Sequence, residues 1–139
     1  MAGPIHATAV CVAGAGVLLV GRPGSGKSDL ALRLIDRGAV LIADDRVITS
    51  GEGGKLLLCA PATIAGLLEV RGLGLHTLPY VNNVQAVAIF DLDAAPVRLS
   101  DPATREICGV NLPLVAVLPF EASAPLKVEL AVAVFLRGR

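Results

Sequence analysis

The chain has 139 residues, and its formal net charge at neutral pH is zero, from twelve basic and twelve acidic side chains. This length predicts one domain, residues 1–139, with room for a substantial core, and the balanced charge excludes an overall basic field for nucleic acid or an anionic membrane. Apolar residues make up 54% of the chain and aromatic residues only 3%, which favours tightly packed strands and helices over a large aromatic binding surface.

The cysteines and the start of the chain bear on where the protein works. Cys11, Cys59 and Cys108 lie far apart in apolar stretches and match no metal or redox spacing, so we expect buried, reduced thiols. No basic region precedes the first apolar run, as it would in a signal peptide. The longest apolar run, residues 7–20, is broken by glycines and is shorter than the ~20 residues that span a bilayer. We therefore expect a cytoplasmic protein without a membrane segment.

The first predicted elements form a βαβ unit. Residues 17–20 are apolar and end at Gly21, which indicates a buried strand. Residues 28–37 carry apolar side chains at helical spacing, and Gly38 follows as a helix-ending glycine. The apolar residues 39–43 predict a second strand. Strand, helix and strand within about thirty residues predict that the two strands are parallel.

The remaining elements have weaker signals. Residues 56–60, 86–92 and 112–119 read as strands, and residues 62–70 are expected to begin as a helix. Residues 126–137 fit helix or strand by periodicity, and their length favours a helix.

The segment from Gly21 to Ser28, GRPGSGKS, matches the phosphate-binding pattern G-x-x-x-x-G-K-[ST] at every fixed position. Glycines allow a turn in which backbone N–H groups converge on an anion, and the following helix adds the positive end of its dipole. Lys27 supplies a charge for the β- and γ-phosphates, and Ser28 a hydroxyl for Mg²⁺. We expect the whole loop to hold the phosphates: Gly21, Arg22, Pro23, Gly24, Ser25, Gly26, Lys27 and Ser28.

Two carboxylates, Asp44 and Asp45, follow the strand predicted at residues 39–43. Ligands of open α/β sheets bind beyond the carboxyl ends of strands, so both should lie on the edge that carries the phosphate loop. Because successive side chains of a strand point in opposite directions, only one of them is expected to face the phosphates. A carboxylate there can hold Mg²⁺ or accept a proton from an attacking hydroxyl.

Residues 16–47, with the signature LLEVRGLGL at residues 67–75, resemble the catalytic domain of bacterial HPr kinase/phosphorylase. The fold implied is α/β: a P-loop kinase domain with a central, mostly β sheet, a P-loop βαβ unit and a C-terminal helix. The activity implied is ATP-dependent phosphorylation of a serine on the phosphocarrier HPr, with Mg²⁺, and its reversal by inorganic phosphate to give pyrophosphate. The resemblance also implies a homo-oligomer, a hexamer. The zero net charge predicts no nucleic-acid or membrane partner.

The resemblance also implies roles for single residues. Asp45, supported by Asp44, takes the proton of the target serine, and Lys27 binds the transferred group. Glu69 is implied as a metal ligand beside Ser28. Three further residues are implied near the reaction: Arg71 as a phosphate contact, His6 and Arg98 as catalytic residues.

The sequence departs from the family pattern at three places. The histidine motif begins at residue 6, so we expect a short form without the N-terminal domain. Pro23 replaces a usual serine and removes one backbone donor. Residues 119–125 contain Glu121 and no basic residue, where longer members carry basic residues used in dephosphorylation. We therefore expect the phosphorylase activity to be weak or altered.

Three other functions stay open at this point. A small-molecule kinase would carry an arginine-rich lid, and a GTPase would carry an Asn-Lys-x-Asp motif; the sequence has neither. The third is a regulatory module that binds a nucleotide without transferring phosphate. Retention of Lys27, Ser28, Asp45 and Glu69 together argues against it.

Overall fold

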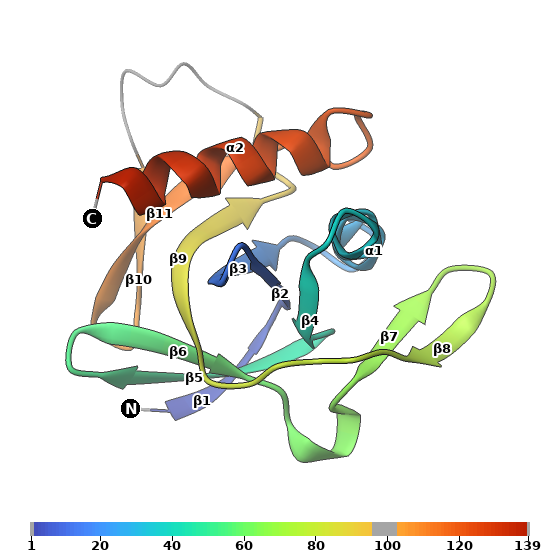
Figure 1. The fold of residues 1–139 in the computed structure, drawn as a ribbon, viewed down its shortest axis with the longest axis horizontal. Coiled ribbons are helices and arrows are strands. Elements are labelled where there is room, and N and C mark those ends of the chain that lie inside the picture. Colours follow the sequence, from blue (N-terminus) through green and yellow to red (C-terminus); the bar gives the residue numbers. More distant parts are fainter. Residues whose placement is uncertain (1, 96–102, 139) are drawn as a thin grey trace.

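The computed structural model describes residues 2–95 and 103–138, and strands dominate it (Figure 1). It contains a nine-stranded sheet and a separate two-stranded hairpin, β7–β8. The strands are β1 (Ala2–His6), β2 (Thr8–Val12), β3 (Ala15–Val20), β4 (Val40–Ala43), β5 (Arg46–Glu52), β6 (Lys55–Cys59), β7 (Leu67–Val70), β8 (Gly74–Thr77), β9 (Val84–Asp91), β10 (Ala103–Ile107) and β11 (Val110–Ala116). The helices are α1 (Lys27–Asp36), α2 (Ala124–Arg137) and a 3₁₀ turn, η1 (Ala62–Ile64).

The sheet runs in the order β1-β5-β6-β9-β3-β2-β4, and β11 pairs with β9 and β10 beside this path. Both β3 and β4 are antiparallel to β2, which lies between them. The two strands of the predicted βαβ unit are therefore parallel, as expected, but they are not neighbours. Parallel pairing does occur on the other side of β3, between β3 and β9 and between β9 and β11.

Apolar side chains are buried on both faces of the central strands. Leu19 of β3 belongs to one cluster, which includes Leu30 and Leu34 of α1 and Val128 of α2. Leu18, its neighbour, belongs to a second cluster on the other face of the sheet. Every residue of β3 is buried, which explains its unbroken apolar sequence.

Helix α1 ends as the sequence predicts, with Gly38 at a φ of 110°. The Gly38 N–H bonds the Ile35 carbonyl at 3.0 Å, and the Ala39 N–H bonds the Leu34 carbonyl at 3.0 Å. These two bonds form a Schellman motif, which needs a left-handed residue at that position. The chain then turns directly into β4, whose end carries the aspartate pair.

Most predicted elements are confirmed, including the strands seen as β3, β4, β6, β9 and β11 and the helix seen as α2. The expected helix at residues 62–70 is wrong. Only the single turn η1 forms there, because the chain becomes extended at Ala65 (ψ 130°) and Gly66 takes a φ of 78°. The remainder is strand β7, in which Leu68 is buried and Glu69 is exposed.

The three cysteines are free thiols, as expected, but each is half-buried rather than buried. Burial raises the pKa of the Cys11 thiol. Within residues 2–95 and 103–138, no helix is long and apolar enough to cross a membrane.

Candidate active site

The loop between β3 and α1 has the form of a phosphate cradle. Gly24 and Gly26 have φ values of 82° and 99°, which strain any residue with a Cβ. A Cβ added to Gly21 would lie 2.5 Å from the Ser25 Oγ, so the loop closes tightly there. The Ser25 hydroxyl is buried and has no hydrogen-bond partner among the described residues. An unpartnered buried hydroxyl in a glycine-rich loop before a helix fits a site for an oxyanion.

Lys27, the first residue of α1, folds back over this loop. Its Nζ donates to the carbonyl oxygens of Gly21 at 2.7 Å and Arg22 at 3.0 Å. These two bonds leave one of the three ammonium donors for a further acceptor. The charge is therefore held at the mouth of the loop, where the sequence predicts the β- and γ-phosphates.

The Asp44 carboxylate links three separate parts of the chain. Its Oδ1 accepts hydrogen bonds from the Ser28 hydroxyl at 2.7 Å and the Thr8 hydroxyl at 2.9 Å. Its Oδ2 accepts one from the backbone N–H of Glu69 at 3.1 Å. Asp44 is buried, so these bonds lie in a low dielectric, where they are stronger than in water. One carboxylate thus joins the phosphate loop, strand β2 and the LLEVRG signature.

Asp45, the neighbour of Asp44, is exposed and lies in a strained turn. The Arg46 N–H bonds the Asp44 carbonyl at 2.8 Å, which forms a three-residue turn centred on Asp45. Asp45 has a φ of 69°, which is the rare, strained form of such a turn. Strain of this kind collects at functional sites. As expected for the pair, one carboxylate contacts the loop and the other does not.

His6 ends strand β1 beside this turn. It is exposed and lies opposite Arg46 in the antiparallel pair of β1 with β5. The next residue, Ala7, donates its N–H to the Asp45 carbonyl at 3.3 Å. The structure therefore brings His6 next to the aspartate pair, as the resemblance implies.

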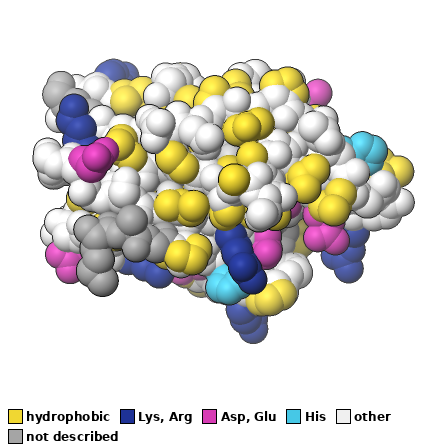
Figure 2. Space-filling model, turned by 90° about the horizontal axis from the view of Figure 1, so that it is seen from below, with side chains coloured by type: hydrophobic (Ala, Val, Ile, Leu, Met, Phe, Trp, Pro, Cys, Tyr) yellow, Lys and Arg dark blue, Asp and Glu magenta, His cyan; other side chains and the backbone are white. Residues whose placement is uncertain are grey.

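The structure places Glu69 and Arg71, the two signature residues, differently. Glu69 is held next to Asp44 by its own backbone, and its side chain is exposed. Arg71 is exposed in the turn between β7 and β8. Arg98 lies outside the described residues. Figure 2 shows acidic, basic and histidine side chains gathered beside a hollow near one edge of the face seen from below.

A magnesium ion at this site would use oxygen ligands. The Ser28 hydroxyl and the Asp44 carboxylate are already in contact, and the backbone of Glu69 bonds the same carboxylate. Among the residues that the structure describes, no group of three His, Cys, Asp or Glu side chains is arranged to hold a metal ion. Magnesium normally keeps several waters and needs only one or two protein carboxylates, so the donors present fit it.

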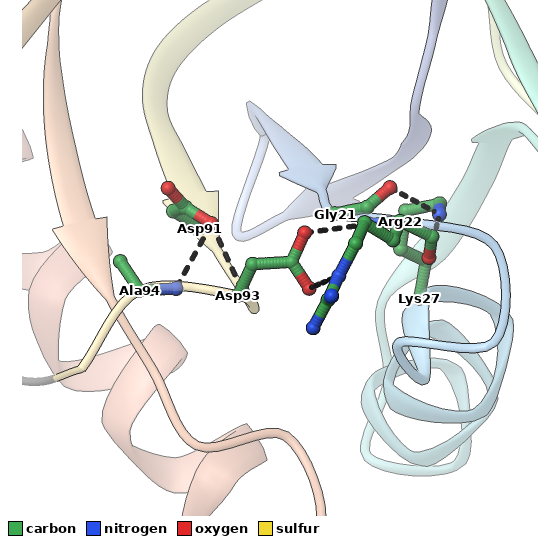
Figure 3. Close-up of polar contacts among 6 residues, drawn as sticks. All are labelled: Gly21, Arg22, Lys27, Asp91, Asp93 and Ala94. Carbon is green, nitrogen blue, oxygen red and sulfur yellow. Dashed lines mark hydrogen bonds and ion pairs between the residues drawn. The ribbon is translucent and has the colours of Figure 1, made fainter.

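A second aspartate pair holds the other side of the phosphate loop (Figure 3). The Asp93 carboxylate accepts the Arg22 N–H at 2.7 Å and lies 3.5 Å from the Arg22 Nε. Asp91, the last residue of β9, in turn accepts the N–H groups of Asp93 at 2.9 Å and Ala94 at 3.3 Å. This chain of contacts fixes the start of the loop to the strand beside β3.

Comparison with known proteins identifies the family. The sequence profile described as HPr Serine kinase C-terminal domain matches residues 2–90. The chain belongs to this family. Its matched segment contains the phosphate loop, Asp44 and Asp45, and the LLEVRG signature.

Relatives within the HPr kinase family agree with this assignment. The HPr kinase/phosphorylase of Mycoplasmopsis pulmonis is 46% identical over 83 residues, which are 60% of this chain and 27% of that protein. The HPr kinase/phosphorylase of Chlorobium chlorochromatii is 40% identical over 125 residues, 79% of this chain and 38% of that protein. The chain therefore spans well under half the length of these relatives.

A solved structure extends the match to the fold. The Hpr(Ser) kinase/phosphatase from Coxiella burnetii has a TM-score of 0.82 and 26% identity, and the match covers 94% of both chains. The predicted α/β kinase fold, with its sheet, P-loop unit and C-terminal helix, is confirmed.

Sequence reasoning missed three residues that shape this site: Thr8, Asp93 and Phe120. Thr8 could have been noticed as a polar residue within an apolar strand. Asp93 follows a predicted strand, where ligand-binding residues gather. Phe120, whose ring lies against Gly26 of the loop, gave no signal, because a single aromatic residue in a loop is ordinary.

Proposed function

We propose that this chain is the catalytic domain of an ATP-dependent protein-serine kinase that phosphorylates a serine of an HPr-type phosphocarrier protein. The observation that carries the proposal is the Asp44 carboxylate, which bonds both the Ser28 hydroxyl of the phosphate loop and the backbone of Glu69 in the family signature. The names of the relatives, each an HPr kinase, support the choice of substrate.

Each part of the site has its own role in the proposed phosphoryl transfer. The loop amides and the Lys27 ammonium hold the triphosphate and oppose the charge that spreads over the transferred oxygens. The serine oxygen of the carrier forms a bond to the γ-phosphorus as the bond to the ADP oxygen breaks. Asp45 accepts the proton of the serine hydroxyl, and its exposed position allows a protein substrate to reach it.

Further residues support this step. Asp44 positions Ser28 and, with it, the first turn of α1. Ser28 and Glu69 are proposed to hold Mg²⁺, which would supply positive charge to the phosphates. His6 lies beside the Asp45 turn and Arg71 beside the signature strand, where they are proposed to contact the reacting phosphates. The catalytic role of Arg98 stays a prediction.

The reverse reaction uses the same geometry with inorganic phosphate as the acceptor, and it releases pyrophosphate. We propose that it is weak in this protein. Pro119 and Phe120 lie against Gly26 of the phosphate loop. The next residue, Glu121, is acidic, and it pairs with Lys127 at 3.2 Å. This segment therefore offers no basic side chain of its own to a phosphate. Robust release of pyrophosphate from a serine-phosphorylated carrier would contradict this.

The direct experiment is incubation with γ-labelled ATP, Mg²⁺ and the HPr-type carriers of the same cell, for the wild type and Asp45→Asn. We expect label on one carrier serine, lost by at least a hundredfold in the variant. Nucleotide binding is measured in parallel on both proteins and should be similar. Tight ATP binding with no transfer to any carrier would instead support a nucleotide-binding regulatory module.

The assembly and location are also proposed from the family. We propose a single domain over residues 1–139, a cytoplasmic protein and a homo-oligomer, expected to be a hexamer. Helix α2 leaves Leu126, Leu130 and Val134 exposed at a spacing of four residues, which suits subunit contact. Sedimentation as a monomer at micromolar concentration would contradict the assembly.

A further inference from the structure

Phe120 is an exposed aromatic residue beside the phosphate loop. The chain has three phenylalanines and no tryptophan. Phe90 is fully buried and Phe135 packs against the core, whereas Phe120 is 69% exposed. A ring left in water needs no explanation when it stands alone, but the position of this one is specific.

The ring touches a glycine of the loop. A Cβ added to Gly26 would lie 2.9 Å from the Phe120 Cζ and 3.0 Å from its Cε1. The edge of the ring therefore rests on the backbone of Gly26, immediately before α1. Because Gly26 has no side chain, the aromatic ring reaches the place where the triphosphate is proposed to lie.

The segment that carries Phe120 is anchored on both sides of the ring. The guanidinium of Arg33, from α1, donates to the carbonyl of Pro119 and, at 3.2 Å, to the carbonyl of Glu121. The same guanidinium pairs with Asp29 at 3.0 Å. The backbone on both sides of Phe120 is thus fixed to α1, just before the start of α2 (Figure 1).

We infer that Phe120 is the platform on which the nucleobase of the bound nucleotide stacks. The inference rests on the proposed function, since it assumes a nucleoside triphosphate in the loop. The nucleoside joins the triphosphate at one end, and a flat apolar surface next to the phosphate cradle suits the face of a base. Stacking on an aromatic ring does not depend on which base is present.

The surroundings of the ring also predict weak base discrimination. The carbonyls on either side of Phe120 each already accept a hydrogen bond from Arg33, and the ring itself offers no group that distinguishes one base from another. ATP and GTP should therefore bind within a few-fold of each other. The larger purines should bind more tightly than CTP or UTP, because they offer more stacking area.

The test compares a ligand that has a base with one that has none. Binding of ATP and of inorganic tripolyphosphate is measured by calorimetry, each with Mg²⁺, on the full chain. Phe120→Ala should weaken ATP binding roughly fivefold to a hundredfold, the range of stacking on an aromatic side chain. Tripolyphosphate binding should stay within about twofold. Leu136→Ala, which removes an exposed apolar side chain near the far end of α2, is the control and should change neither ligand.

Phe120→Trp gives a second readout, because it places the only indole of the protein at this site. Its fluorescence should be quenched by ATP and unchanged by tripolyphosphate, and its affinity for ATP should equal or exceed that of the wild type. Equal loss of both ligands in Phe120→Ala, or no loss of ATP affinity, would overturn the inference. These experiments measure nucleotide binding and not catalysis. Failure to transfer phosphate to any carrier would therefore refute the kinase proposal and leave the inference about Phe120 standing.

Discussion

The Asp44 carboxylate is the contact on which the site depends, and removing it makes the most direct test. Asp44→Ala deletes the acceptor of three hydrogen bonds, from Ser28, Thr8 and the backbone of Glu69. The three donors come from parts of the chain that no other described side chain joins in this way. The variant should therefore affect both the stability of the fold and the phosphate loop.

The magnitude follows from which donors can find water. The Ser28 hydroxyl is half-exposed and can turn to solvent, so its bond is largely replaced. Thr8 is fully buried and the Glu69 N–H is fixed in a strand, so both lose their partner. A buried donor that is left without an acceptor costs ~1–3 kcal/mol of stability. The variant should lose about 2–5 kcal/mol of unfolding free energy, which for a chain of this size lowers the melting temperature by roughly 6–15 °C.

Asp44→Asn separates charge from hydrogen bonding. Turned with its oxygen towards the Glu69 N–H, the asparagine amide can donate to both hydroxyl oxygens, so the Glu69 N–H keeps its acceptor and only the two hydroxyl protons lose theirs. The variant should lose roughly 1–2 kcal/mol, less than Asp44→Ala. The order of stability should be wild type, then Asp44→Asn, then Asp44→Ala.

Thermal and urea unfolding followed by circular dichroism measure these differences. Asp45→Asn is the matched control, since it removes the adjacent charge from an exposed side chain and asparagine tolerates a positive φ. Its unfolding free energy should stay within about 0.5 kcal/mol of the wild type. If Asp44→Ala melted with Asp45→Asn, or above it, the three bonds would not hold the site together.

Three further changes test neighbouring parts of the structure. Gly26→Ala should be less stable than Gly24→Ala in urea unfolding, because both glycines have positive φ but only at Gly26 does a new Cβ meet the Phe120 ring; equal losses would contradict that contact. Arg33→Lys should weaken ATP binding several-fold in calorimetry, with a smaller effect on tripolyphosphate. One ammonium cannot hold the carbonyls on both sides of Phe120 as a guanidinium does. Unchanged ATP affinity would contradict the idea that Arg33 positions the Phe120 ring. Burial raises the pKa of the Cys11 thiol, so the folded state keeps this proton to higher pH than the unfolded chain. That contribution to stability is complete below the unfolded thiol pKa of about 8.5 and is lost as pH rises through the folded value, so Cys11→Ala should flatten the fall of melting temperature at alkaline pH, and an unaltered slope would contradict it.

The order of the main strands and helices could be predicted because their signals are local. The loop glycines, the apolar spacing of α1 and the glycine at its end all act over a few residues, and each was confirmed. Strand β2 was missed because the glycines in the apolar run at residues 7–20 do not stand in one of the dipeptides typical of a hairpin turn. The turn inside it uses Ala13 and Gly14 with φ values of 52° and 82°, and alanine is not a residue that signals such a turn.

The error at residues 62–70 has a different cause. The leucines and alanines there favour a helix, and Gly66 weakens that preference without forbidding it. The strand forms because Leu68 is buried in the core cluster that contains α1 and because the Glu69 N–H reaches Asp44. Both contacts come from the tertiary structure, which overrides a weak propensity.

The roles of the two aspartates show where sequence reasoning about the site stops. A strand that continued through residues 44 and 45 would place the two side chains on opposite faces, and no local signal would say which one faces the loop. The tight turn at Asp45 decides this, because it ends the strand and leaves Asp44 pointing to Ser28 while Asp45 projects into solvent. Such turns have no sequence signature, and the positive φ that this one needs is costly for aspartate. In the proposed function, Asp45 is the strained, exposed residue that meets the hydroxyl of the protein substrate, next to a buried neighbour that holds the loop.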